Sequence, residues 1–120
     1  MIEKTILDYL NGLPDAPAPA LAEIPPGGIT PPAWIIQRTG GGTIEGHVGT
    51  AMVAIQSYGE SLYLAAELNG QIVRIMDVIT EKPEIAACRL NSDYNFTDTA
   101  KKKYRYQAVF DLVYYDQEDS

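Results

Sequence analysis

The chain has 120 residues and a mass of 13.2 kDa, which is enough for one compact domain and too little for two separate cores. Its formal net charge of -7, from 16 acidic and 9 basic residues, disfavours general nucleic-acid binding, for which a net basic surface is usual. No apolar run approaches the roughly 18 residues of a membrane-spanning helix, so we expect one globular domain with neither a membrane contact nor sequence-specific nucleic-acid binding.

A short amphipathic helix is expected at the N-terminus, within residues 1–13. The apolar residues of this segment fall on one helical face: Ile2, Ile6, Tyr9 and Leu10. Gly12 followed by Pro14 supplies the signal that ends the helix. The segment lacks the apolar block and small-residue cleavage site of a secretion signal, which favours synthesis in a reducing cytoplasm.

A proline-rich arm is predicted over residues 14–32. This segment holds seven of the eight prolines, and each proline removes an N–H and biases the preceding residue away from helical conformations. Leu21, Ile24 and Ile29 give the arm enough apolar surface to lie against the domain or against a neighbouring molecule.

Two strands are expected after the arm, at the start of a core that spans residues 33–116. Residues 33–39 are rich in Trp and Ile, and they run into a glycine-rich loop at residues 40–46. Residues 46–58 form the second strand. The middle of this strand, residues 51–55, is apolar on both faces, which predicts a central strand that is covered on both sides.

Residues 57–79 could form either a helix or a hairpin, because Asn69-Gly70 is a strong hairpin signal. Apolar residues recur at steps of three and four from Leu64 to Ile79, whereas strict alternation fails in this stretch. Periodicity therefore predicts one helix, with Ser57 and Glu60 as its capping box.

Two further strands are expected at residues 84–91 and 103–115, joined by a long polar loop at residues 92–102. The last strand has the clearest alternation, with Tyr, Ala, Phe and Leu on one face. Residues 117–120 form an acidic tail. The expected fold is therefore α+β, a four-stranded antiparallel sheet made of two hairpins, with one helix packed on it and a short N-terminal helix.

The residues that usually carry chemistry are isolated in this sequence. His47 is the only histidine, and Cys88 is the only cysteine and stands in an apolar strand, so neither has a partner that the sequence reveals. The segment Gly40 to Gly46 lacks the Gly-Lys-Ser/Thr ending of a phosphate-binding loop. We therefore expect no enzymatic activity, no catalytic residue, no cofactor and no bound metal.

The two expected loops, residues 40–46 and 94–103, are too polar to fold into the core, and they are therefore available for partners. The second loop carries the only basic cluster of an acidic chain. Exposed ion pairs contribute little, so apolar contacts from Tyr94, Phe96 or the proline-rich arm must supply most of the affinity. The candidate assembly residues are Tyr94, Phe96, Asp98, Lys101, Lys102, Lys103 and Arg105. Their candidate acidic partners on a neighbouring copy are Asp93, Asp98, Asp116, Glu118 and Asp119.

The order of these segments resembles that of the small tail-terminator or tail-completion proteins of long-tailed bacteriophages, over residues 34–116. In that family, a strand with a Ser/Tyr/Gly-type turn leads to a helix of Leu-Ala-Glu-Leu character, as in Ser57 to Gly59 and Leu64 to Leu68 here. A polar loop with an aromatic, Asp and Thr then precedes a basic-aromatic strand, as in Tyr94 to Asp98 and Tyr104 to Asp116 here.

The resemblance implies a structural virion protein without a cofactor. Such a protein assembles as a hexameric ring on the head-proximal end of the tail tube, stops tube growth and provides the surface that joins the head. Its partners would be itself, the tail tube protein and a head-neck protein, and its place would be the virion tail after synthesis in the bacterial cytoplasm. Two alternatives remain: a head-side neck protein, and a small ligand-binding module or enzyme of unknown substrate.

Overall fold

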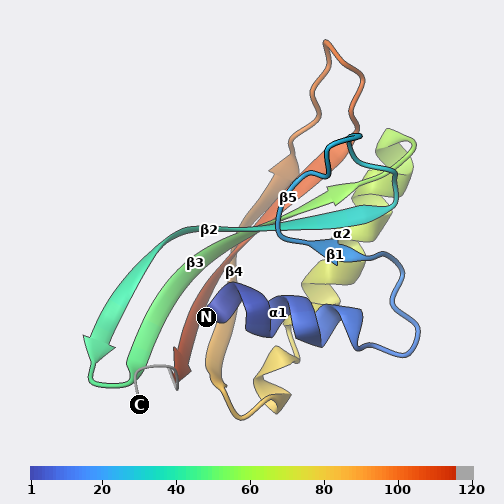
Figure 1. The fold of residues 1–120 in the computed structure, drawn as a ribbon. Coiled ribbons are helices and arrows are strands. Elements are labelled where there is room, and N and C mark those ends of the chain that lie inside the picture. Colours follow the sequence, from blue (N-terminus) through green and yellow to red (C-terminus); the bar gives the residue numbers. More distant parts are fainter. Residues whose placement is uncertain (116–120) are drawn as a thin grey trace.

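A five-stranded sheet forms the body of the protein, and two helices and a short 3-10 helix accompany it (Figure 1). The computed structural model describes residues 1–115, apart from the side chains of residues 44 and 45. The strands are β1 (Ala20–Leu21), β2 (Ala33–Glu45), β3 (Val48–Tyr58), β4 (Ile85–Asn95) and β5 (Arg105–Tyr115). The helices are α1 (Ile2–Asn11), α2 (Leu62–Met76) and the 3-10 helix η1 (Ile79–Glu81).

The sheet is mixed, so the expected four-stranded antiparallel sheet is wrong. Its strand order is β1-β2-β3-β5-β4, and β1 pairs in parallel with β2 through Ala20 with Trp34 and Leu21 with Ile35. The side chain of Asn11 acts as a further strand partner for Ala20, because its Nδ2 donates to the Ala20 carbonyl at 3.0 Å and its Oδ1 accepts from the Ala20 N–H at 2.9 Å. A two-residue strand inside a proline-rich arm has too few residues for any alternation to be visible in the sequence.

The expected glycine loop at residues 40–46 is also wrong, because β2 runs through it to Glu45. Gly41 lies at φ +128°, and a Cβ there would stand 2.2 Å from the Thr50 carbonyl oxygen. Glycine at this position therefore allows the backbones of β2 and β3 to approach closely. It lies next to a register shift in their pairing, between Arg38 and Gly40. The turn is confined to residues 46 and 47.

Residues 69 and 70 lie inside α2, which confirms the helix over the hairpin. The predicted bounds of 57–79 are too wide, however, because β3 continues to Tyr58. The predicted Ser57–Glu60 capping box is therefore wrong. The N-cap is Ser61, whose Oγ accepts a hydrogen bond from the Leu64 N–H at 3.1 Å.

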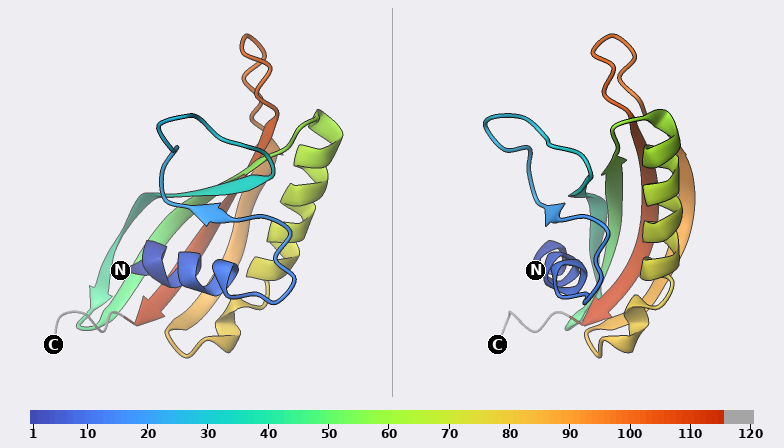
Figure 2. Two further views of the ribbon diagram at one scale, coloured as in Figure 1. Left: turned by 45° about the vertical axis from the view of Figure 1, so that its right-hand side comes forward. Right: turned by 90° about the vertical axis from the view of Figure 1, so that its right-hand side faces the viewer.

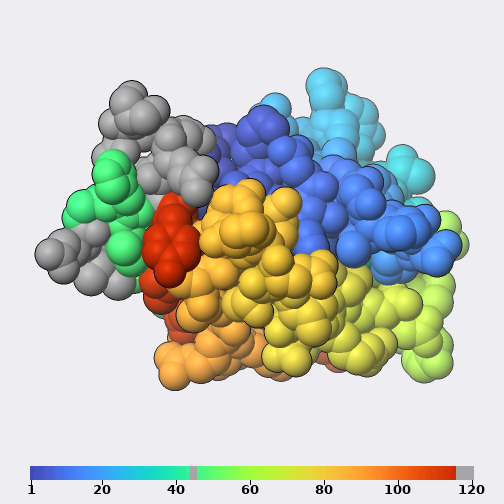
Figure 3. Space-filling model, turned by 90° about the horizontal axis from the view of Figure 1, so that it is seen from below, coloured from blue at the N-terminus to red at the C-terminus, as the bar shows by residue number. Residues whose placement is uncertain are grey.

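One hydrophobic core joins both helices to the same face of the sheet. The predicted stripe of α1 is confirmed, since Ile2, Ile6 and Leu10 are buried, while Tyr9 is half-buried and donates its hydroxyl to Glu81 Oε1 at 3.0 Å. Figure 2 shows α1 crossing the strands and α2 running alongside them. Seen from below, α1 (blue) lies against the segment around η1 (gold) (Figure 3). The main buried residues of this core are Ile2, Ile6, Leu10, Trp34, Ile36, Val53, Ile55, Leu68, Ile72, Met76, Ile79, Phe110 and Leu112.

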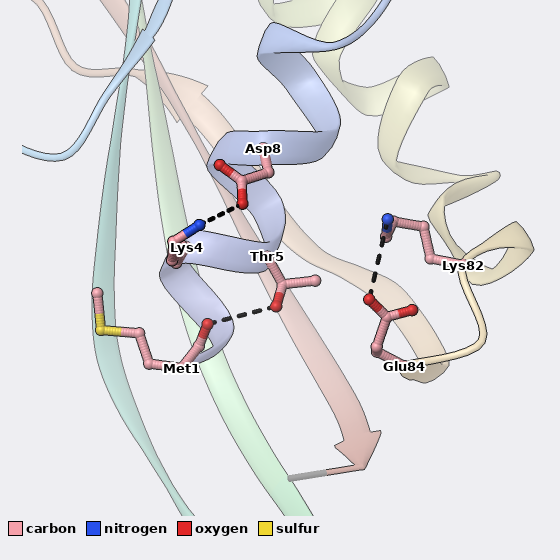
Figure 4. Close-up of polar contacts among 6 residues, drawn as sticks. All are labelled: Met1, Lys4, Thr5, Asp8, Lys82 and Glu84. Carbon is pink, nitrogen blue, oxygen red and sulfur yellow. Dashed lines mark hydrogen bonds and ion pairs between the residues drawn. The ribbon is translucent and has the colours of Figure 1, made fainter. Parts of the chain in front are cut away.

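The outer surface of α1 carries short-range polar contacts between Lys4 and Asp8 and between Thr5 and Met1 (Figure 4). Lys4 Nζ lies 2.6 Å from Asp8 Oδ2, and the Thr5 hydroxyl donates to the Met1 carbonyl at 3.3 Å. Both contacts are exposed, and exposed pairs of this kind contribute about 0 to 1 kcal/mol each. Apolar burial therefore holds α1 in place. No helix among residues 1–115 is long and apolar enough to cross a membrane.

Replacing Ile6 with Ala should lower the free energy of unfolding by about 2 to 5 kcal/mol, because the side chain is fully buried and leaves a cavity between α1 and the sheet. Ile24→Ala is the matched control, since Ile24 is 55% exposed and should change stability by less than about 0.5 kcal/mol. Urea unfolding followed by circular dichroism measures both. Equal losses for the two variants would show that α1 does not pack as described.

Candidate assembly surface

One face of the sheet is covered by neither helix, and we call it the open face. It is formed by the residues that alternate with the core positions of the strands. The predicted central place of β3 is confirmed, because it pairs with β2 and β5. The predicted cover on both faces is right only in part: Val53 and Ile55 are buried under the helices and Ala54 is 1% exposed on the open face, but Met52 is 37% exposed there. Residues of the open face include Ile35, Gln37, Met52, Ala54, Gln56, Tyr58, Arg89, Tyr94, Arg105, Gln107, Val109, Asp111 and Val113.

A chain of hydrogen bonds crosses the open face from β3 to β4. Arg105 Nη1 donates to the Tyr58 hydroxyl at 2.9 Å, which donates in turn to Gln56 Oε1 at 3.2 Å. Gln56 Nε2 donates to Gln107 Oε1 at 3.0 Å, and Gln107 Nε2 donates to the Tyr94 hydroxyl at 2.6 Å. These side chains donate and accept hydrogen bonds among themselves, and the last of these bonds fixes the ring of Tyr94 on the edge strand β4. Neither Gln56 nor Gln107 is among the predicted site residues, although a glutamine within each of two apolar strands is a signal of such a pair.

Arg105 holds the base of the hairpin loop at residues 96–104. Its Nε donates to the Phe96 carbonyl at 2.7 Å, and its guanidinium carbon lies 4.5 Å from the centroid of the Phe96 ring. The same carbon lies 5.7 Å from the centroid of the Tyr58 ring. A guanidinium above aromatic faces combines hydrogen bonding with cation–π attraction. Arg105 was a candidate for contact with a neighbour, and the structure shows its guanidinium engaged within its own chain.

The hairpin loop projects from the sheet beyond the start of β5 (Figure 1). The polar loop predicted at residues 92–102 is shifted, because residues 92–95 belong to β4. Asp98 and Lys103 exchange two backbone hydrogen bonds of 3.0 Å, and Asp98 Oδ1 accepts from the Lys101 N–H at 3.2 Å. Asp98 is therefore a turn residue that shapes the loop. Lys101, Lys102 and Lys103 are exposed, as the sequence predicts.

Tyr94 and Phe96 form an exposed aromatic pair where β4 leads into the hairpin loop. Their ring centroids lie 6.0 Å apart with an interplanar angle of 83°, which is an edge-to-face arrangement. Tyr94 is 43% exposed and Phe96 is 37% exposed. Held by Gln107 and Arg105, these rings are ordered before any partner arrives, which lowers the entropy cost of binding.

Both long edges of the sheet have unpaired backbone within the described residues. β4 is the last strand on one side, and on the other side β1 pairs with β2 only as far as Ile35. The pairings β2–β3, β3–β5 and β5–β4 are all antiparallel, so β2 and β4 run in opposite directions. A second copy could therefore place its β2 beside β4 and continue the antiparallel order.

The acidic residues that were predicted to pair with the lysines of a neighbouring copy do not all lie on a free surface. Asp93 Oδ2 accepts a hydrogen bond from Asn69 Nδ2 of α2 at 2.8 Å, so it joins the helix to β4 within one chain. Asp116, Glu118 and Asp119 lie outside the described residues, as do the end of the expected core at residue 116 and the expected tail at residues 117–120.

His47 and Cys88 lie on different parts of the sheet, which are separated by β5. His47 is exposed in the turn between β2 and β3, while Cys88 is half-buried in β4. The Cys88 thiol lines a shallow hollow of about 160 Å³ between β4 and α2, where Val73 and Leu90 are neighbours. Burial raises the pKa of Cys88 to about 11, with smaller contributions from Asp77 and Asp111.

Among residues 1–115, no cluster of three or more His, Cys, Asp or Glu side chains could hold a metal ion.

No protein-family model matches the chain, and a search of curated proteins finds no match. The function of the open face therefore has to be argued from its geometry and from the sequence pattern.

Replacing Arg105 with Lys should loosen the hairpin loop, because an ammonium cannot make both hydrogen bonds and stack on Phe96. The exchange of the Phe96, Asp98 and Lys103 amides with solvent should become about 5- to 30-fold faster, which corresponds to about 1 to 2 kcal/mol. Arg89→Lys is the control, since Arg89 is exposed and lies 3.8 Å from Asp111. Hydrogen exchange by NMR measures both variants, and unchanged exchange in Arg105→Lys would contradict the described contacts.

The Cys88 thiol should be alkylated slowly. With a pKa near 11 in place of the ordinary 9.0, the thiolate fraction below pH 9 is about 100-fold smaller than in the unfolded chain. Iodoacetamide labelling at pH 8, in buffer and in urea, should show that ratio. The labelling rate of the folded protein should keep rising from pH 9 to pH 11. Equal rates in buffer and urea would show that the thiol is not buried.

Proposed function

We propose that the protein is a structural subunit that assembles as a hexameric ring on the end of a phage tail tube, stops tube growth and offers the surface that joins the head. The resemblance of residues 34–116 to tail-terminator proteins suggests this role. The single observation that supports it most directly is the one-sided sheet, with both helices on one face, β4 unpaired on one edge and β2 unpaired beyond Ile35 on the other.

The sheet edges allow a head-to-tail ring. In a head-to-tail interface, β4 of one subunit lies beside β2 of the next, and the opposite directions of these strands continue the antiparallel order. Repetition of one such contact closes into a ring when the rotation fits. The open face, with its ordered aromatic pair, then lies beside the junction between subunits.

The charge of the chain also agrees with this role. A net charge of -7 on each subunit gives a ring a strongly acidic character. Acidic walls repel phosphates, so DNA could pass through a channel without adhering to it.

The direct test mixes the purified protein with tail tubes that lack a terminator and, separately, with DNA-filled heads that lack tails. Electron microscopy should show a hexameric ring at the end of each tube. Binding to heads alone would assign the protein to the head side of the neck. Binding to neither, without any ring at high protein concentration, would contradict a structural role and favour a ligand-binding module or an enzyme.

Replacing Tyr94 with Ala should weaken ring formation about tenfold or more, because a central aromatic side chain at an interface often contributes most of the binding energy. Tyr63→Ala is the matched control, since Tyr63 is 72% exposed on α2, on the helix side of the sheet. Native mass spectrometry over a concentration series, with and without tubes, measures the effect. If Tyr63→Ala weakened assembly and Tyr94→Ala did not, the subunits would associate through the helices.

A further inference from the structure

A groove of about 270 Å³ separates the proline-rich arm from the hairpin loop. Ile29 and Pro31 of the arm line it, together with Tyr58 and Tyr104 and the basic run Lys101–Lys103. Arg105, which holds the base of the loop, fixes the side of the groove that carries the lysines. The groove therefore has apolar and aromatic walls and a basic rim.

The positive charge at this groove is not balanced within the described residues. Glu60 is the only carboxylate that lines it, and Asp98 supports the loop through the Lys101 N–H. The ammonium groups of Lys101–Lys103 make no ion pair with any residue of the described chain. In a chain of net charge -7, three unpaired ammonium groups beside a groove fit an acidic peptide.

The sequence supplies such a peptide directly after β5. Residues 116–120 are Asp-Gln-Glu-Asp-Ser, with three carboxylates in five residues. This segment follows Tyr115, the last residue of β5, whereas the hairpin loop precedes Arg105 at the other end of the same strand. Figure 1 shows the loop and the arrowhead of β5 at opposite ends of the molecule.

The segment is too short to reach the groove of its own chain. β5 is 11 residues long, so its ends lie roughly 33 Å apart at the rise of an extended strand. Five extended residues span at most about 18 Å. An ion pair between residues 116–120 and Lys101–Lys103 must therefore join two molecules.

We propose that residues 116–120 of one copy bind in the groove beside Lys101–Lys103 of the next copy. The contact uses different surfaces on the two molecules, so it is head-to-tail, and its repetition generates a ring or an open chain. It rests on the proposed function and deepens it, because it names a contact between subunits that are offset along the strand direction, so that the end of β5 in one copy lies near the start of β5 in the next. Since the groove and its rim are exposed, added salt should weaken the contact.

Carbodiimide cross-linking tests the contact directly, because it joins a lysine amine and a carboxylate only where they touch. A mixture of ¹⁴N- and ¹⁵N-labelled protein should give cross-linked peptides of mixed isotope that join residues 101–103 to residues 116–119. If other cross-links between molecules form and these do not, or if the protein stays monomeric at every concentration, the proposal is wrong.

A charge exchange gives an independent test by sedimentation velocity at low salt. The loop variant K101E/K102E and the tail variant D116K/E118K should each lose self-association at least tenfold. An equimolar mixture of the two should recover it, because each variant then offers the surface that the other needs. K4E/R74E is the matched control for the loop variant, since it makes the same change in net charge as K101E/K102E at exposed positions on α1 and α2.

Failure of this contact is distinguishable from failure of the proposed function. Both tests above use the purified protein alone, whereas the proposed function is tested on tail tubes. If the loop and tail variants associate like the wild type and also cap tubes, the tail-to-groove contact is wrong, while the proposed ring is still supported. Loss of capping in every variant and in the wild type would overturn the proposed function.

Discussion

The uninterrupted pairing of β3 with β5 determines both faces of the sheet. Eleven consecutive residues of β3 are paired with eleven of β5, from Val48 with Tyr115 to Tyr58 with Arg105, without a bulge. This register places Val53 beside Phe110 in the core and Gln56 beside Gln107 on the open face. A shift of one residue would turn the core residues to the open face and the glutamines to the helix side, so one pairing between distant segments decides which surface is left for partners.

The outer strands are less regular than this central pair, and their irregularities lie where the sheet is open. β2 and β4 each have two register shifts, whereas β3 and β5 have none between them. Bulges at edge strands protect against indiscriminate edge pairing. An edge that is irregular and carries Arg89 and Asp93 favours one defined neighbour over continuous aggregation, which is what a closed ring requires.

The segments with a strong periodic pattern were predictable, and those held by single contacts were not. The stripe of Ile2, Ile6 and Leu10 identified α1, and spacing correctly favoured a helix across Asn69-Gly70. By contrast, β1 depends on the side chain of Asn11 and on parallel pairing with β2, and neither has a signature in the sequence. The capping box was misplaced because Ser57 and Ser61 are both followed by plausible helix starts, and only the length of β3 decides between them.

The candidate surface was predictable in composition but not in arrangement. The sequence identified the exposed lysines and the aromatic pair of the hairpin loop. It assigned Arg105 and Asp98 to a partner, whereas both support the loop within the chain. A charged residue beside aromatics has the same appearance in a sequence whether it faces a neighbour or its own sheet. The direction of its side chain follows from the register of β4 and β5, which the sequence does not reveal.

Assembly along the open edges of the sheet is the proposal on which the other inferences depend. Hydrogen exchange of backbone amides, compared between the free protein and protein bound to tail tubes, measures this most directly. The account predicts slower exchange in β4 and in residues 37–45 of β2 after assembly, with α1 and α2 unchanged. Slower exchange in the helices, with β4 and β2 unaffected, would contradict it.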